Sequence, residues 1–177
     1  MKKFAILGSI LAVVALLFAT VVPAMAAPPS TVTVSWEEDA TRYYPDGTVW
    51  ASWTDDPNGP MELLQTGKAY HAVAIAEFYN ILLPDVEGSL VISGAGKLSG
   101  HATYTSLASG LPIKEHFKGD VTIDPDGGTM VGNYTQYAWA FGTAEDVLTY
   151  YPNALPEKSP EAGGWWLIGY TVYTVHQ

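Results

Sequence analysis

The fold class is decided by residues 119–141, which read GDVTIDPDGGTMVGNYTQYAWAF. Residues 120–124 and 129–141 are rich in β-branched and aromatic side chains, which favour strands. Between them lies the sequence Asp-Pro-Asp-Gly-Gly of residues 124–128. A tight turn is expected there, because proline presets φ and glycine supplies a positive φ. The stretch therefore predicts a β-hairpin.

A similar hairpin precedes this one. Four residues of the earlier segment recur 31 or 32 positions later, with the pairs Gly88 and Gly119, Ile92 and Ile123, Gly96 and Gly127, and Gly100 and Gly132. The earlier segment predicts a strand over residues 89–93, a turn over 94–96 and a strand over 97–105. The period does not continue along the chain, so we interpret the two segments as successive hairpins of one sheet rather than as a repeat protein.

Three further segments favour strands. Residues 31–36 alternate polar and apolar side chains, as a half-buried strand does, and residues 48–53 resume after the turn sequence Pro-Asp-Gly. Residues 165–175 are largely apolar on both faces, so we expect both faces to be covered. The chain therefore predicts a single antiparallel all-β domain. A small barrel with meander-like connectivity is the leading architecture, and a β-sandwich is the alternative.

Three segments are expected to interrupt the strands, and a fourth is ambiguous between helix and strand. Residues 144–150 follow an N-cap threonine and begin with acidic residues, which predicts a short helix. Residues 68–83 mix helix-favouring and strand-favouring residues, and we interpret them as a strand because they lead directly into the next one. Residues 55–60 consist of turn residues and predict a loop. Residues 152–164 contain three prolines and a Gly-Gly pair, which predicts a long loop of the kind that often forms a lid.

Residues 1–26 have the pattern of a secretion signal. Lys2 and Lys3 precede an apolar run that reaches Val22, and Ala24-Met25-Ala26 is a small-x-small cleavage sequence. We expect cleavage after Ala26 and an exported domain over residues 27–177. An uncleaved N-terminal anchor is the alternative, because the apolar run is close to the length that spans a bilayer. No second apolar run in residues 27–177 is long enough to do so.

The composition of residues 27–177 excludes several classes of partner and site. Lys2 and Lys3 leave with the signal, so six of the eight basic residues remain against 18 acidic ones, a formal charge of −12. Such an acidic domain disfavours nucleic acid and anionic lipid as partners. The absence of cysteine excludes disulfides, thiolate zinc sites and cysteine nucleophiles. No cofactor is expected, and the oligomeric state stays open.

One carboxylate is a candidate catalytic group. Glu77 lies within an apolar segment, and a strand there would place it on the same face as His71. Inside a barrel, a carboxylate and an imidazole would form an acid–base pair. This pair would make the protein a barrel enzyme, an isomerase, a cyclase or a hydrolase. A solvent-facing position for Glu77 is the alternative, and no G-x-S-x-G nucleophile motif is present.

Ion sites have little support. Calcium is the best candidate, because Asp56 and the pair Asp124 and Asp126 lie in segments with several oxygen ligands. The same residues are ordinary turn formers, and we favour that interpretation. The four histidines show no paired spacing for a transition metal.

The aromatic residues carry the leading functional hypothesis. Tyr137 and Trp139 alternate onto one face of a strand in an aromatic-rich last third of the chain. We expect an exported, non-catalytic barrel that binds an apolar or aromatic small molecule through Tyr137, Trp139, His101, His71 and Glu77. A carbohydrate-binding or cell-surface module is a third hypothesis. It requires exposed tryptophans on a flat face, and the candidates are Trp50, Trp53 and Trp139.

Overall fold

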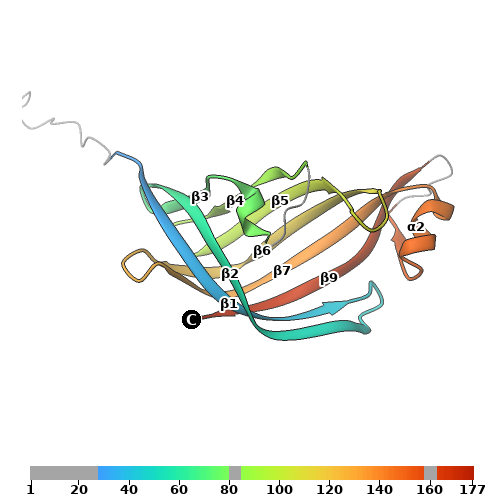
Figure 1. Ribbon diagram of the computed structural model, residues 1–177, viewed down its shortest axis with the longest axis horizontal. Helices are drawn as coiled ribbons and strands as arrows, with labels where there is room; N and C mark the ends of the chain where they lie inside the picture. The colour runs from blue at the N-terminus through green and yellow to red at the C-terminus, as the bar shows by residue number, and fades with distance from the viewer. Residues whose placement is uncertain (1–27, 80–84, 158–162) are drawn as a thin grey trace, which may run out of the picture.

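A single antiparallel sheet closes on itself to form a barrel (Figure 1). The computed structural model describes residues 28–79, 85–157 and 163–177. Its strands are β1 (Ser30–Tyr43), β2 (Val49–Thr66), β3 (Ala69–Ala72), β4 (Glu87–Ile92), β5 (Lys97–Thr105), β6 (Pro112–Asp124), β7 (Thr129–Gly142), β8 (Leu155–Pro156) and β9 (Gly164–His176). Strands β1 to β7 pair in chain order, β7 pairs with β9, and β9 pairs with β1. The expected antiparallel barrel with successive hairpins is confirmed.

In the described part of the chain, two short helices interrupt the strands: η1 (Ile75–Phe78), a 3-10 helix, and α2 (Ala144–Tyr150). The helix expected at residues 144–150 is confirmed. A capping box begins it, in which the Asp146 amide donates to Thr143 Oγ1 and the Thr143 amide donates to the Asp146 carboxylate. These contacts satisfy amide groups that the first turn of a helix would otherwise leave unpaired.

The loop expected at residues 55–60 is wrong, because these residues continue β2. They pair with β1 through two register shifts, one between Val34 and Trp36 and one between Glu38 and Ala40. Such bulges let a strand absorb residues that fit a regular ladder badly. Within this paired segment Asp55 adopts a positive φ of 52°. Tertiary pairing has overridden the turn propensity of the sequence.

The strand expected over residues 68–83 is wrong beyond its first part. Strand β3 ends at Ala72 and pairs with β4 at only two positions. The chain then turns into η1, where Ile75 and Phe78 are buried in the main apolar cluster. Residues 80–83 lie outside the described residues. The apolar side chains of this segment therefore reach the core from a short helix and not from a strand.

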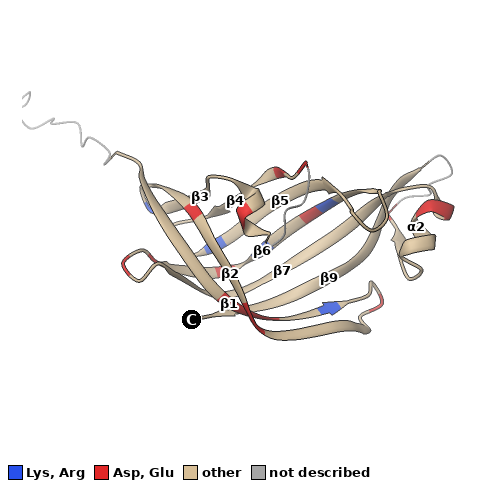
Figure 2. Cartoon of the chain, in the orientation of Figure 1, with Lys and Arg blue, Asp and Glu red and all other residues tan. Residues whose placement is uncertain are grey.

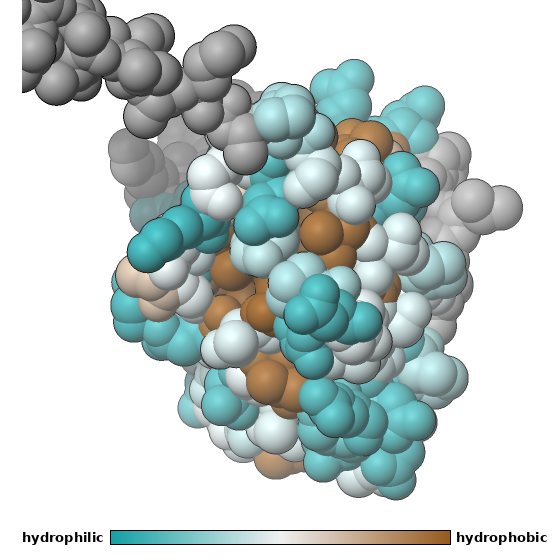
Figure 3. All heavy atoms as spheres, turned by 90° about the vertical axis from the view of Figure 1, so that its left-hand side faces the viewer, coloured by the Kyte–Doolittle hydropathy of each residue, from teal (hydrophilic) through white to brown (hydrophobic). Residues whose placement is uncertain are grey.

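The main apolar cluster fills the barrel on the side away from α2. Its fully buried side chains come from β1, β2, β4, β5 and β7, and are Val34, Met61, Leu63, Leu90, Ile92, Leu98 and Met130. Seen from the left-hand side of Figure 1, hydrophobic residues lie in the middle of this end and hydrophilic residues surround them (Figure 3). Burial of this set stabilises the barrel and leaves the interior near α2 to other side chains.

Two glycines let neighbouring strands approach closely. A Cβ on Gly119 of β6 would lie 2.2 Å from the Asn133 carbonyl oxygen of β7. A Cβ on Gly100 of β5 would lie 2.6 Å from the Ser89 carbonyl oxygen of β4. Glycine at such points permits the sharp bending that a closed sheet needs.

Acidic residues lie where β1 and β2 cross near the C-terminus (Figure 2). Glu37, Glu38 and Asp39 of β1 face the β2 segment that holds Asp55 and Asp56. Among the described residues, no helix has the length and apolar character needed to cross a bilayer.

Candidate ligand pocket

The pairing register sets which side chains meet inside the barrel. Residues that lie directly opposite each other on neighbouring strands share a face. Thr171 of β9 lies opposite both Arg42 of β1 and Gln136 of β7. In the next row, Ala138 of β7 lies opposite Glu115 of β6 and Gly169 of β9. These two rows form one wall of the barrel interior.

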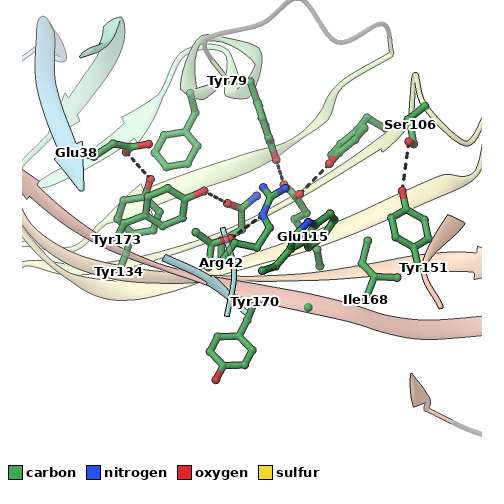
Figure 4. Close-up of a pocket in the computed structure, with 18 of the residues that line it drawn as sticks. Glu38, Arg42, Tyr79, Ser106, Glu115, Tyr134, Tyr151, Ile168, Tyr170 and Tyr173 are labelled. Carbon is green, nitrogen blue, oxygen red and sulfur yellow. Dashed lines mark hydrogen bonds between the residues drawn. The ribbon is translucent and has the colours of Figure 1, made fainter. Parts of the chain in front are cut away.

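A pocket of about 580 Å³ lies against this wall. The apolar cluster closes one side, and the loop after β5 together with the residues at the end of α2 borders the other. Aromatic rings supply much of the lining, and Figure 4 shows several of them around the central polar groups. The aromatic residues are Trp50, Phe78, Tyr79, Tyr104, Tyr134, Tyr150, Tyr151, Tyr170 and Tyr173.

Glu115 is the central carboxyl group of the pocket. It is only 4% exposed and lies on β6 between the buried residues Ile113 and Phe117. The hydroxyl of Tyr104 donates to Oε1 at 2.8 Å, and the hydroxyl of Tyr79 donates to Oε2 (Figure 4). Burial raises the pKa of Glu115, and these hydrogen bonds oppose the shift without cancelling it. Both carboxylate oxygens are therefore occupied by phenol donors.

Glu38 is a second buried carboxyl group, held on β1. Its Oε2 accepts hydrogen bonds from Trp36 Nε1 at 3.1 Å and from the Tyr134 hydroxyl at 3.0 Å. Burial raises the pKa of Glu38, and the two hydrogen bonds oppose that shift. Tyr134 stacks on Tyr173 with ring centroids 4.3 Å apart, and the Tyr173 hydroxyl donates to Gln136 Oε1 at 2.6 Å.

Burial also acts on the phenols. It raises the pKa of Tyr79, Tyr104, Tyr134 and Tyr173 above the ordinary value for tyrosine, and the neighbouring carboxylates add to the shift. The four phenols are therefore neutral at physiological pH and serve as hydrogen-bond donors.

Arg42 is the one arginine of the sequence, and it lines the pocket. Its Nε donates to Thr171 Oγ1 at 3.3 Å, and its guanidinium lies 5.3 Å from the Trp50 ring centroid and 5.8 Å from that of Trp53. Within the described residues it forms no ion pair with a carboxylate. Its charge still lowers the pKa values of Glu115 and Tyr104 relative to what burial alone would give.

The residues that the sequence singled out lie elsewhere. His71 of β3 pairs with Val91 of β4. Glu77 of η1 accepts a hydrogen bond from the Glu62 amide at 2.7 Å. Neither lines the pocket described above. The expected acid–base pair is therefore not part of this pocket.

The other three candidates alternate with inward-facing neighbours and so lie on the outer face of the barrel. His101 adjoins the buried Ala102, and Tyr137 is 41% exposed. Trp139 lies beside His116, with ring centroids 5.0 Å apart, and beneath the Lys114 ammonium. His101 and Tyr137 border a shallow concave area on this outer surface. The alternation of the strands separates all three from the interior pocket.

The three tryptophans expected for a glycan-binding module do not form one group, because Trp50 and Trp53 lie beside Arg42 and Trp139 lies beside Lys114. Trp50 is 44% exposed at the rim of the pocket. Trp53 is half-buried, and its Nε1 is buried without a hydrogen-bond partner among the described residues. Trp139 lies on a different strand beneath Lys114.

The calcium candidates have separate roles in the structure. Asp124 Oδ1 accepts hydrogen bonds from the amides of Asp126 and Gly127, which is turn chemistry. Asp56 lines the pocket. Where side chains are described, a different group brings ligand atoms within 4.8 Å of one another, formed by Glu37, Asp55 and His176.

The sequence contained signals for the pocket residues that our interpretation missed. Glu115 lies in the run Lys-Glu-His-Phe-Lys of residues 114–118, which resembles a solvated charged segment. Strict alternation with Ile113 and Phe117 would have placed its side chain on the apolar face. The lone arginine, Arg42, follows Trp36, Glu38 and Ala40 at the same spacing of two residues.

Comparison with known proteins adds no relative. No protein-family model, no curated protein and no solved structure matches this chain.

Proposed function

We propose that this protein is an exported, non-catalytic β-barrel that binds an aromatic or apolar small molecule in its interior pocket. The observation that carries the proposal is the pocket of about 580 Å³ with aromatic walls and a few convergent polar groups. Small-molecule sites typically have volumes of about 300–1,000 Å³ and this mixture of lining groups. The pocket is therefore large enough to enclose a ligand of several rings.

The arrangement of the polar groups favours binding over chemistry. Tyr79 and Tyr104 occupy both oxygens of Glu115, and Trp36 and Tyr134 converge on Glu38. A general base must reach the proton that it removes, so carboxylates held in this way are poorly placed to act. The network instead fixes the rings that line the cavity.

The direct test is to isolate the protein from its own host and examine it by native mass spectrometry. We expect a bound small molecule that is released on denaturation. Ala138→Leu adds a side chain beside Glu115 in the pocket wall and should abolish retention. The matched control Ala95→Leu lies in the exposed turn before β5 and should retain the ligand. Equal retention by both variants would count against the pocket.

Export is tested separately by the mass of the protein outside the cells. Cleavage after Ala26 would remove residues 1–26, whose structure lies outside the described residues. We expect the shortened mass in the extracytoplasmic fraction, whereas an uncleaved anchor would leave the full-length protein in the membrane fraction.

A second candidate function, a barrel enzyme, is favoured by one observation. Glu115 combines deep burial, a raised pKa and a position in the pocket, and such groups cluster at active sites. A recovered ligand that is chemically altered by the unmodified protein, but not by Glu115→Gln, would establish catalysis. A ligand unchanged by both supports the binding function.

A further inference from the structure

We propose that the ligand of this pocket carries a carboxylate group that binds the guanidinium of Arg42. This inference rests on the proposed binding function, since it concerns the chemistry of the molecule that the same pocket receives. It extends that function by assigning the chemical group of the ligand that lies beside Arg42.

The first argument is a comparison of hydrogen-bond donors. The phenols of Tyr79, Tyr104 and Tyr134 donate to carboxylates, and Tyr173 donates to Gln136. Arg42 has five N–H donors, and its one hydrogen bond to another described residue uses Nε. It therefore holds the main unused donor capacity of the pocket.

The second argument concerns charge. Arg42 is the one lysine or arginine among the described residues that line the pocket, and none of the described carboxylates forms an ion pair with it. A charge withdrawn from water is stabilised when a partner supplies both opposite charge and hydrogen bonds. A carboxylate supplies both, because its two oxygens match the fork of a guanidinium.

The third argument is that the guanidinium is held in place before a ligand arrives. Thr171 fixes Nε, and the rings of Trp50 and Trp53 lie beside the guanidinium. A group held in this way loses little conformational freedom on binding, which increases affinity.

The two deeply buried carboxylates of the pocket, Glu115 and Glu38, do not offer an equivalent site for a cation. Glu115 already accepts two phenol hydrogen bonds, and Glu38 accepts one from an indole and one from a phenol. Burial favours the neutral form of both groups, as their raised pKa values indicate. A cationic ligand would have to displace these internal donors.

Three probes with one ring system test the inference by isothermal titration calorimetry on the full-length chain. They are 2-naphthylacetate, the neutral 2-naphthylacetamide and the cationic 2-naphthylmethylammonium. We expect the acid to bind about tenfold to hundredfold more tightly than the amide, as charge-assisted hydrogen bonds imply. Arg42→Gln should reduce the affinity for the acid to that for the amide and leave the amide unchanged. Arg42→Lys, which keeps the charge but loses the fork, should fall between the two.

The outcomes separate the inference from the function on which it rests. Equal binding of acid and amide, abolished by Ala138→Leu, would overturn the carboxylate and leave the pocket as a binding site. Tighter binding of the ammonium probe would overturn it in favour of a cationic ligand. Failure of all three probes to bind would overturn the inference together with the proposed function. If Arg42→Gln does not fold, the inference is tested by whether the unmodified protein binds the acid more tightly than the amide.

Discussion

Buried titratable residues in the pocket make the stability of the barrel depend on pH. Glu115 is buried and accepts hydrogen bonds from Tyr79 and Tyr104, and its folded-state pKa lies above the ordinary value of 4.5. A raised pKa means that the folded protein binds this proton more tightly than the unfolded chain does. The free energy of unfolding must then depend on pH.

We predict that Glu115→Gln flattens part of that pH dependence. The contribution of Glu115 is most favourable below pH 4.5 and is lost as the pH rises through its raised folded-state pKa. Glutamine does not titrate, so the free energy of unfolding of the variant should fall less steeply as the pH rises above 4.5. Urea unfolding at intervals across this range measures both slopes. Identical slopes would contradict the assignment.

Other titrating groups determine the pH dependence of stability that remains in the Glu115→Gln variant. Glu38 also has a raised pKa, so a smaller slope of the same sign should persist. The His176 pKa is raised by its hydrogen bond to Asp39, so its contribution is fully present below pH 6.5 and is lost at higher pH. The lowered pKa values of Asp39 and Asp46 act in the opposite direction, below pH 3.8. The window just above pH 4.5 therefore reports on the buried carboxyl groups.

The two-residue alternation of side chains along a strand identifies pocket residues better than the charge of the neighbouring residues in the sequence does. The sequence directed attention to Glu77, whose neighbours are apolar, but Glu77 accepts a backbone hydrogen bond and does not line the pocket. Glu115 has charged neighbours in sequence and apolar neighbours in space. In a strand, residues two positions away share the face, so Ile113 and Phe117 decide its environment.

Among the elements, predictions from the sequence were confirmed where an element's own residues supply its cap or turn. They were wrong where pairing with a neighbouring strand determines the structure. The helix α2 has its own cap, and each of the two glycine-rich hairpins has its own turn. Residues 55–60 form a strand because β1 accepts them through two bulges. No property of those six residues alone could indicate that pairing.

The cap of α2 predicts a modest and local effect. Thr143→Ala removes the side chain that accepts from the Asp146 amide, so it should lower the free energy of unfolding by about 1 kcal/mol. Thr149→Ala is the matched control in the same helix, because Thr149 only donates to the Glu145 carbonyl. Its effect should stay below about 0.5 kcal/mol. Chemical denaturation of both variants makes the comparison, and equal losses would exclude a role for the cap.

The close approach of β6 and β7 predicts a larger effect. Gly119→Ala would place a methyl group 2.2 Å from the Asn133 carbonyl oxygen, so one strand must move. We expect the free energy of unfolding to fall by about 1–3 kcal/mol, as overpacking typically causes. Lys118→Ala, one residue away on the exposed face, should change it by less than about 0.5 kcal/mol. A tolerated Gly119→Ala, measured by urea unfolding, would show that the sheet does not need glycine there.

For the whole molecule, closure of the sheet was accessible from the sequence, but the pocket and its aromatic lining were not. Successive hairpins indicated a meander, and the pairing of β9 with β1 completes the ring. The position of a cavity depends on which interior rows carry small residues. Ala138 and Gly169 lie in the row of Glu115, and this arrangement follows from register across three strands. Register of that kind is a property of the assembled barrel.

Ligand binding should stabilise the barrel as a unit. With 2-naphthylacetate at about 100 times its dissociation constant, linkage adds about 2.7 kcal/mol to the free energy of unfolding. For a domain of this size, that gain corresponds to a rise in Tm of roughly 5–10 °C. Ala138→Leu should show no such rise, because its side chain occupies the binding space. Thermal unfolding followed by circular dichroism tests both, and an equal rise in the variant would place the binding site elsewhere.

The lone arginine also makes the pocket addressable by covalent labelling. Dicarbonyl reagents such as phenylglyoxal condense with guanidinium groups, and Arg42 is the single such group in the chain. Among guanidinium groups, labelling should therefore modify Arg42 alone, at a rate set by access to the pocket. A bound carboxylate should slow that rate, and the neutral amide at equal occupancy should slow it less. One residue thus reports the occupancy of the interior in an unmodified protein.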